Sequence, residues 1–194
     1  MNFLKNIYIW TLKKAEHKNA KWYLSLISFS ESSFFPIPPD ILLIPMALAS
    51  KTKALFYAFI CTLSSVLGGI FGYAIGYFFF NSIGLYIVEF YHLENSFSIF
   101  ENYYKEFGIL IVLGAGITPF PYKFITIASG VFGLNIYLFV IVSIIGRGLR
   151  FYLIAILLYF FGEKIKLFID KYFNILSIIF FILLVGSVFI IRFL

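Results

Sequence analysis

The sequence predicts an all-α polytopic membrane protein with two inverted re-entrant hairpins, about three transmembrane helices and interfacial amphipathic helices. Hydrophobic residues make up 62% of its 194 residues and charged residues only 12%, a composition far outside the range of soluble domains. The apolar residues form long runs with lysines near their ends, and all six prolines fall in two short motifs that interrupt such runs. We therefore expect a single membrane domain over residues 1–194.

The first 21 residues, MNFLKNIYIWTLKKAEHKNAK, are expected to form an amphipathic helix in the plane of the lipid head groups. Apolar residues such as Phe3 and Ile7 lie near one side of this helix, and the lysines lie elsewhere. No small-residue cleavage site precedes Glu31, so we expect the segment to be retained and not removed as a secretory signal.

Residues 22–50 contain two short apolar pieces separated by the stretch PIPPD. Each piece reaches only roughly 18 Å into a bilayer core about 30 Å thick, so neither spans it alone. The segment is therefore either one distorted span or a re-entrant hairpin that returns to its own side. A returning hairpin places ten lysines on one side of the membrane, against only Lys105 and Arg192 on the other. This bias favours two re-entrant hairpins, a cytoplasmic N-terminus and an external C-terminus.

Residues 54–80 are long enough to cross the membrane, and small residues recur every four positions on one face of this span, at Ser64, Gly68, Gly72 and Gly76. Small side chains at that spacing let a second helix approach closely. We therefore assign the three glycines to helix packing.

The rest of the chain supplies a connection, a second broken segment and two more spans. Residues 81–106 are expected to lie outside the membrane and to include a second interfacial helix, because their apolar residues follow a four-three repeat. Residues 107–134 again form two short apolar pieces, broken at TPFPYK. Residues 136–161 and 173–193 are further candidate transmembrane helices, separated by a charged turn.

An internal repeat relates the two broken segments, with units at about 22–80 and 107–161. A shift of 83 residues aligns PIPPDILLIPMALA with PFPYKFITIASGVF, and Asp40 then aligns with Lys123. Because one crossing separates the hairpins, the second must enter from the opposite leaflet, so the repeat is inverted and both breaks meet near the midplane. The residues that we expect to break the helices are Pro36, Pro38, Pro39, Pro119 and Pro121.

Five charged residues fall at membrane depth: Glu31, Asp40, Lys123, Arg147 and Arg150. Each costs roughly 2.5 to 3.5 kcal/mol at the bilayer centre when unpaired, so these side chains must face one another or water. Arg147 and Arg150 are three residues apart and project from the same side of a helix. Two acids and three bases leave one positive charge, which a bound anion would balance.

These charges define the candidate site. We assign Lys123, Arg147 and Arg150 to phosphate binding, because all three are cations at membrane depth and the guanidinium groups of the two arginines suit the bidentate geometry of that anion. Glu31 and Asp40 are candidates for proton coupling, since carboxylic acids within membranes carry protons in many pumps and transporters. A pair such as Glu31 with Arg147 could instead be a structural clasp that holds a hairpin to a helix.

The sequence contains no clear motif for metal binding, disulfide formation or catalysis. His17 and His92 are too isolated for a metal site, and Cys61 has no partner thiol. We therefore predict no catalytic residues, no metal and no cofactor, and we disfavour an enzyme. The net charge of +6 comes from lysines at the ends of apolar runs, which indicates a membrane surface and not nucleic acid as the partner.

Four stretches together resemble the YqaA branch of the DedA family, whose core is called the VTT or SNARE-associated Golgi domain: FSESSFFPIPPDILLIPMALA, SVLGGIFGYAIGYF, GITPFPYKFITIASGVFGLN and GRGLRF. The resemblance covers nearly the whole chain. It implies a multi-pass protein of the bacterial inner membrane with two facing re-entrant hairpins and a polar cavity. The family's acidic residues correspond to Glu31 and Asp40. Its second-hairpin motif of arginine, proline and arginine is partly kept, because Lys123 stands near the second arginine and no basic residue precedes Pro119.

The wider family is similar to lipid transporters and scramblases, and some bacterial members are linked to recycling of undecaprenyl phosphate. The resemblance therefore implies a proton-linked flippase or scramblase for a phosphate-bearing lipid. Its partners would be membrane lipids, polyprenyl phosphate among them, and protons. A proton-coupled transporter of a small solute or ion is the alternative, and a membrane enzyme or a structural scaffold is less favoured. The sequence is compatible with a homo-oligomer.

Overall fold

The computed structural model describes residues 19–35, 37–90, 94–118, 120–162 and 164. Within these ranges the chain is all-helical and contains no β-strand, as the sequence predicted. The expected interfacial helix 1–21 lies outside the described residues except for its last three positions, and the expected transmembrane helix 173–193 lies wholly outside them.

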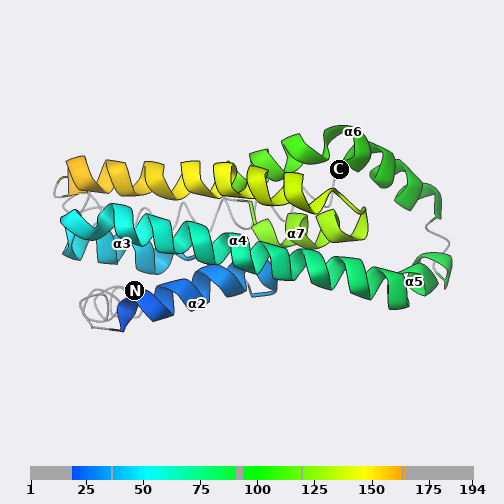
Figure 1. Ribbon diagram of the computed structural model, residues 1–194, viewed down its shortest axis with the longest axis horizontal. Coiled ribbons are helices and arrows are strands. Elements are labelled where there is room, and N and C mark those ends of the chain that lie inside the picture. The colour runs from blue at the N-terminus through cyan, green and yellow to red at the C-terminus, as the bar shows by residue number, and fades with distance from the viewer. Residues whose placement is uncertain (1–18, 36, 91–93, 119, 163, 165–194) are drawn as a thin grey trace, which may run out of the picture.

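The first broken segment is a helical hairpin made of α2 (Ala20–Ser33) and α3 (Asp40–Ala49). Helix α2 ends where the amides of Phe34 and Phe35 both donate to the Ser30 carbonyl. Helix α3 begins directly after Pro39, whose φ of −66° already suits a helix and whose missing N–H is not needed there. The hairpin enters from one end of the molecule and returns to that end (Figure 1).

A long helix follows the first hairpin. The short 3₁₀ turn η1 (Lys51–Lys53) leads into α4 (Ala54–Phe79), which extends about 39 Å at a rise of 1.5 Å per residue. The chain then passes through a π-helical turn, η2 (Phe80–Gly84), into α5 (Leu85–Phe90) at the opposite end of the molecule (Figure 1).

The second hairpin consists of α6 (Glu94–Ile117) and α7 (Tyr122–Val131). Two elements were expected here, an interfacial helix before residue 106 and an apolar piece after it, but α6 runs through that boundary without a break. No proline interrupts this part of the chain, and the Tyr104 hydroxyl, 2.7 Å from Ser129 Oγ, fixes the middle of α6 to α7. Change of polarity along a helix does not end it when the backbone hydrogen bonds can continue.

The last described helix is Ile136–Gly162. Gly133, with a φ of +62°, ends α7, and the Leu134 amide donates to the Ser129 carbonyl across this turn. The side chain of Asn135 then caps the next helix, since its Oδ1 accepts from the amide of Tyr137 at 3.0 Å. Helices Lys51–Phe79 and Ile136–Gly162 are both long and apolar enough to span a membrane.

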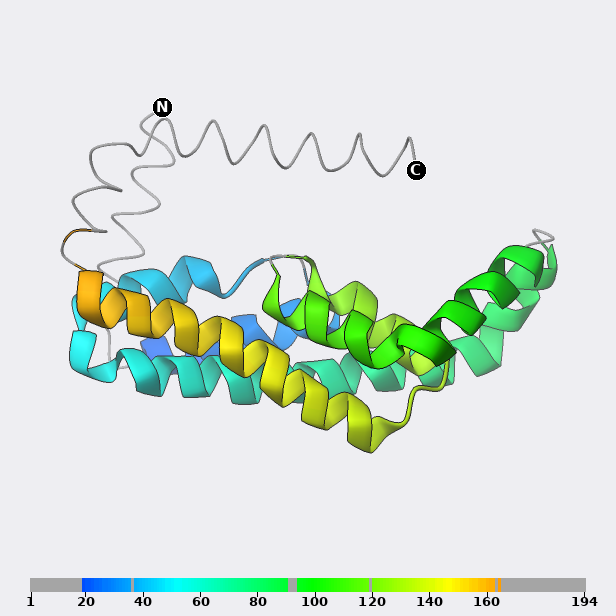
Figure 2. The same cartoon turned by 90° about the horizontal axis from the view of Figure 1, so that it is seen from above.

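The two hairpins open toward opposite ends of the molecule, and their tips meet about halfway along it (Figure 2). Helix α4 packs against both α2 and α7 through its glycine stripe. A Cβ added at Gly68 would lie 2.1 Å from the Phe29 carbonyl oxygen, and one added at Gly76 would lie 2.0 Å from that of Ile127. A Cβ added at Gly72 would lie 2.3 Å from Thr126 Oγ1. The stripe therefore seats both hairpins on one helix.

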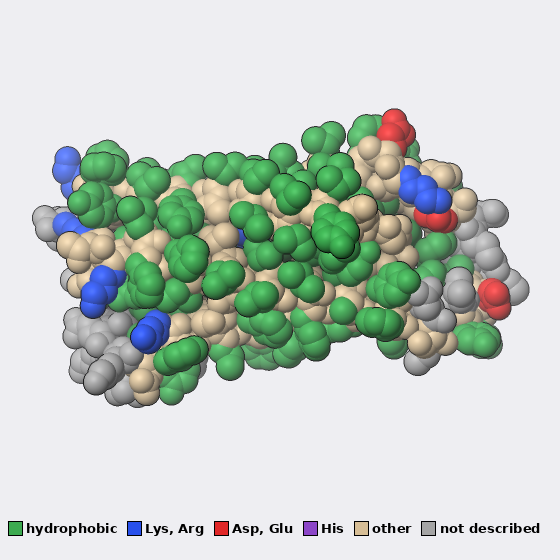
Figure 3. Space-filling model, viewed as in Figure 1, with side chains coloured by type: hydrophobic (Ala, Val, Ile, Leu, Met, Phe, Trp, Pro, Cys, Tyr) green, Lys and Arg blue, Asp and Glu red, His purple; other side chains and the backbone are tan. Residues whose placement is uncertain are grey.

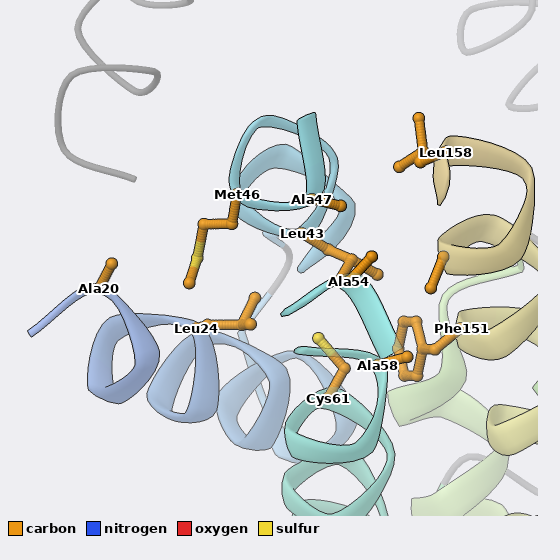
Figure 4. Close-up of a cluster of buried hydrophobic side chains, with 11 residues drawn as sticks. Ala20, Leu24, Leu43, Met46, Ala47, Ala54, Ala58, Cys61, Phe151 and Leu158 are labelled. Carbon is orange, nitrogen blue, oxygen red and sulfur yellow. The ribbon is translucent and has the colours of Figure 1, made fainter. Parts of the chain in front are cut away.

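The larger apolar core joins the first hairpin to both long helices (Figure 4). Its buried members come from α2, α3, α4 and helix Ile136–Gly162, and are Ala20, Leu24, Leu43, Met46, Ala47, Ala54, Ala58, Cys61, Phe151, Ala155 and Leu158.

The surface divides into three zones (Figure 3). Exposed aliphatic and aromatic side chains cover the middle, for example Leu63 and Ile145, which are 51% and 48% exposed. At the end where the first hairpin opens, the described charged side chains are lysines: Lys21, Lys51, Lys53 and Lys164. At the opposite end they include the acids Glu89, Glu101 and Glu106, with Lys105.

Candidate functional site

The five charged residues expected at membrane depth lie together where the hairpin tips meet helix Ile136–Gly162. Glu31 is in the last turn of α2, Asp40 is the first residue of α3, and Lys123 is near the start of α7. Arg147 and Arg150 approach them from the middle of the long helix. Four elements distant in sequence thus contribute to one polar cluster.

Arg147 and Glu31 form a buried ion pair. Arg147 Nη2 lies 2.5 Å from Glu31 Oε2, and the two side chains are only 2% and 11% exposed. Arg147 Nε donates to Ser65 Oγ at 2.6 Å, and Ser32 Oγ donates to the same Glu31 oxygen at 3.2 Å. These contacts connect α2, α4 and helix Ile136–Gly162 through a single guanidinium group.

Aromatic rings hold the same guanidinium from two sides. The Arg147 Cζ atom lies 4.9 Å from the centre of the Tyr122 ring and 4.7 Å from that of Phe151. Tyr122 is itself buried, and its hydroxyl is 2.6 Å from Ser143 Oγ. Its amide donates to Glu31 Oε1 at 3.4 Å, so the start of α7 is connected to the tip of α2. Arg147 therefore has little freedom to leave its partner.

A row of hydroxyl groups extends from this pair along α2 and α4. Ser32 Oγ and Ser65 Oγ are 2.6 Å apart, and Ser28 Oγ donates to the Cys61 carbonyl at 2.8 Å. Thr126 Oγ1 donates to the Ser32 carbonyl at 2.9 Å. Sequence reasoning missed these residues. Ser28 and Ser32 are four residues apart, a spacing that places both on one face of α2. The signal was not specific, because short hydroxyl side chains within an apolar run also fit simple helix packing.

Arg150 and Asp40 form a second, less buried pair. Arg150 Nη2 contacts Asp40 Oδ2, and the side chains are 13% and 20% exposed. Arg150 Nη1 also donates to the Thr118 carbonyl at 2.5 Å, in the break of the second hairpin. Within the described part of the chain, Asp40 Oδ1 and Arg150 Nε have no hydrogen-bond partner. Both atoms are buried, so this pair contains one acceptor and one donor whose hydrogen bonding is unsatisfied in this arrangement.

A cavity of about 250 Å³ lies beside these two pairs. Its lining includes all the candidate site residues except Asp40, together with residues of both hairpin breaks: Glu31, Phe35, Pro38, Pro39, Phe120, Pro121, Lys123, Phe124, Arg147 and Arg150. Lys123 pairs with no carboxylate among the described residues, and its Nζ lies 5.3 Å from the centre of the Phe124 ring. The cavity thus carries one positive charge that no described acid balances.

The predicted prolines and histidines lie partly within and partly outside the described residues. Pro38, Pro39 and Pro121 lie at the breaks and line the cavity, whereas Pro36 and Pro119 lie outside the described residues, as do His17 and His92. Among the described residues no group of three or more histidine, cysteine, aspartate or glutamate side chains could hold a metal ion. The three basic residues assigned to phosphate binding all line the cavity, and they differ in their contacts: Arg147 pairs with Glu31 and Ser65, Arg150 pairs with Asp40, and Lys123 pairs with no described carboxylate.

Two bacterial proteins are similar to this chain over most of its length. One, from Haemophilus influenzae, is 37% identical over 164 residues, which cover 84% of this chain and 85% of that protein. The other, from Histophilus somni, is 36% identical over 167 residues with the same coverage. The chain belongs to their family. Both relatives carry the name "uncharacterized protein", the second as a "HI0703 homolog". No protein-family model and no solved structure matches the chain, so the function of this family has to be argued from the chemistry of the site.

Proposed function

We propose that this chain is a polytopic protein of the bacterial inner membrane that moves a phosphate-bearing lipid, such as undecaprenyl phosphate, across the bilayer with proton linkage. The observation that carries the proposal is the uncompensated charge of Lys123 in a cavity at the meeting point of two opposed hairpins. Lys123 is partly exposed to the cavity, and a cation at membrane depth without a partner is costly, so a bound anion would remove that cost.

Membrane insertion is supported by the zones of the surface. The apolar middle zone suits the hydrocarbon core, and the lysine-rich end suits the cytoplasmic face, since positive charge is retained inside. In this orientation α3 and α7, at ten residues each, are far shorter than the roughly 20 residues of a spanning helix. We therefore place both hairpins as re-entrant segments that enter from opposite leaflets.

The broken backbone at the hairpin tips supports a polar ligand at mid-membrane. The interruptions at 34–39 and 118–121 leave amide and carbonyl groups outside regular helices, and such backbone is tolerated at membrane depth only when it is buried in protein or lines a wet cavity. Opposed breaks of this kind form the binding sites of many transporters.

The two arginines take different roles in this mechanism. Arg147, held by Glu31, Ser65 and two rings, positions the hairpins and does not leave its partner. Arg150 pairs with a carboxylate that an incoming phosphate can displace, and its buried Nε gains a partner when that pair rearranges, so Arg150 and Lys123 hold the anion. Of the two proposed proton carriers, Asp40 is the one whose partner can exchange, and protonation of Asp40 would release Arg150 to the lipid phosphate.

A lipid, in preference to a free anion, is favoured by the aromatic rim of the cavity. Phe35, Phe120 and Phe124 line it and are 45%, 45% and 57% exposed. Rings at the opening of a cationic cavity offer an apolar surface to the chain of a lipid whose phosphate lies inside. The alternative, a proton-coupled carrier of a small anion, is favoured by the volume of about 250 Å³, which lies below the range of about 300 to 1,000 Å³ typical of small-molecule sites.

Reconstituted vesicles test the proposal. A fluorescent polyprenyl phosphate is placed in both leaflets, and a quencher that cannot cross the bilayer reports how fast the inner pool becomes accessible. We expect rapid lipid exchange with the wild-type protein. With Lys123→Met or Arg150→Gln the exchange rate should fall by about tenfold or more, since each substitution removes a charge-assisted contact. Lys53→Met, an exposed lysine at the end of the molecule, serves as the matched control. Uptake of inorganic phosphate without lipid movement would instead support the small-anion carrier.

A further inference from the structure

A second cavity lies at the acid-rich end of the molecule, away from the hairpin tips. Its volume is about 280 Å³, and its walls come from the end of α4 with η2, from α6 and from the end of α7. Tyr77, Phe80, Phe97 and Phe132 line it together with the carboxylate of Glu101. The proposed transport of a lipid phosphate does not use any of these residues.

The aromatic residues form one connected group. The Phe97 ring stacks on Phe80 with centres 4.8 Å apart and an interplanar angle of 7°, and it lies 5.2 Å from the Phe132 ring on α7. Phe132 also lies 5.1 Å from Tyr104, which is hydrogen-bonded to α7. Rings from three elements therefore keep the walls in place, and three of these rings, Phe80, Phe97 and Phe132, line the cavity.

The backbone at this position is unusual. Phe80 begins the π-helical turn η2, and π-helical turns are rare and frequent at functional sites. Gly84 makes room for the ring, because a Cβ there would lie 2.3 Å from Phe80 Cδ2. On the opposite wall, the left-handed φ of Gly133 ends α7 directly after Phe132. Two irregular turns thus bring the rings of Phe80 and Phe132 to the same cavity.

The charge of the cavity favours a cation. Glu101 is 36% exposed, and its Oε1 pairs with Lys105, a neighbour on the surface of α6. A surface pair of this kind contributes little, so another cation can replace Lys105. Glu89 lies at the same end of the molecule and adds negative potential. The faces of aromatic rings attract cations as well, and rings combined with a carboxylate are the usual means of recognising substituted ammonium groups.

We propose that this aromatic pocket binds an organic ammonium group. A bare metal ion would need several oxygen ligands, and Glu101 is the only carboxylate among the described lining residues. An ammonium group that carries carbon substituents can contact the rings with its substituents and Glu101 with its charge. The ammonium can belong to a lipid head group at the membrane surface or to a free amine, and the two sources share this chemistry.

Ligand-observed NMR on the full-length protein in nanodiscs of phosphatidylglycerol tests the proposal. The probes are choline and its uncharged isostere, in which a tert-butyl group replaces the trimethylammonium group. We expect saturation transfer to choline and much less to the isostere. We expect Glu101→Gln and Phe97→Leu each to weaken choline binding by about threefold or more, and Phe97→Tyr, which keeps a π-face, to retain it.

Glu106→Gln is the matched control, because it removes the same charge from the same helix at an exposed position outside the cavity. Equal loss in Glu106→Gln and Glu101→Gln, equal binding of the isostere, or no choline binding at all would overturn the proposal. Nanodiscs that also contain phosphatidylethanolamine distinguish the two sources: suppression of choline binding assigns the pocket to a lipid head group, and unchanged binding assigns it to a free amine. Neither result depends on movement of lipid phosphate.

Discussion

Arg147 Nη2 lies 2.5 Å from Glu31 Oε2, across 116 residues of sequence, and this contact joins the first hairpin to the helix that follows the second. The nearby pair of Arg150 and Asp40 makes an equivalent connection but leaves two polar atoms without a partner within the described chain. The two pairs have the same chemistry and different surroundings. Their differences lead to separate predictions for stability and for transport.

Glu31→Gln should destabilise the protein strongly. The substitution leaves Arg147 buried without its counter-ion, and loss of one partner of a buried pair typically costs about 3 to 5 kcal/mol. The measurement is thermal unfolding of the purified protein in detergent. Glu106→Gln, an exposed acid on α6, should change the free energy of unfolding by no more than about 0.5 kcal/mol. Similar small effects for both variants would mean that Arg147 is not held as described.

Asp40→Asn should affect transport more than stability, in contrast to Glu31→Gln. This pair is less buried than that of Glu31 and Arg147, so its loss should cost less than the loss of Glu31. Lipid exchange in vesicles should lose its dependence on a pH gradient, because the amide cannot take up and release a proton. A variant that is as destabilised as Glu31→Gln, with normal coupling at matched abundance, would assign Asp40 to a structural clasp instead.

Gly76→Ala should disrupt the contact of α4 with the second hairpin. The new Cβ would lie 2.0 Å from the Ile127 carbonyl oxygen, so the helices must separate. We expect a loss of about 2 kcal/mol or more in the free energy of unfolding. Gly114→Ala is the control, because a Cβ there meets nothing within 4 Å, and the higher helix propensity of alanine should leave stability unchanged or raised. A stable Gly76→Ala protein would show that the stripe does not set the helix spacing.

Tyr104 supplies a prediction at high pH. Burial raises the pKa of its hydroxyl to about 12, so the folded protein keeps the proton over a range in which the unfolded chain releases it. The stabilisation is therefore fully present below pH 10 and is lost as the pH rises from 10 toward 12. Tyr104→Phe should cost about 1 kcal/mol near neutral pH and should lose less stability than the wild type above pH 10. Parallel pH curves for the two proteins would contradict this account.

Much of the architecture could be predicted from the sequence because it depends on local chemistry. Pro39 and Pro121 stand directly before α3 and α7, where proline favours the start of a helix, and the spacing of Gly68, Gly72 and Gly76 places them on one face of any helix. The cost of charge in an apolar segment also indicates that Glu31 and its partners must converge. None of these inferences requires knowledge of the tertiary contacts.

The division of roles within the site could not be predicted in this way. Arg147 and Arg150 are three residues apart and look equivalent in the sequence, but only Arg147 lies between the rings of Tyr122 and Phe151. That difference arises from packing between distant segments: a Cβ at Gly116 would lie 3.1 Å from the Cα of Gly146, so α6 approaches the long helix directly beside Arg147. The continuity of α6 was missed for another reason, because the change from polar to apolar residues near position 106 was taken as a boundary although no proline interrupts the helix there.

The most direct test of the central claim is to locate a bound lipid phosphate by photo-crosslinking. A photoactivatable polyprenyl phosphate is incubated with the reconstituted full-length protein, and mass spectrometry identifies the labelled residues. We predict labelling at Phe35, Phe120 or Phe124, competed by unlabelled polyprenyl phosphate and lost in Lys123→Met. Labelling confined to the outward apolar face around Leu149, and unchanged in Lys123→Met, would contradict the claim that the cavity between the hairpin tips holds the phosphate.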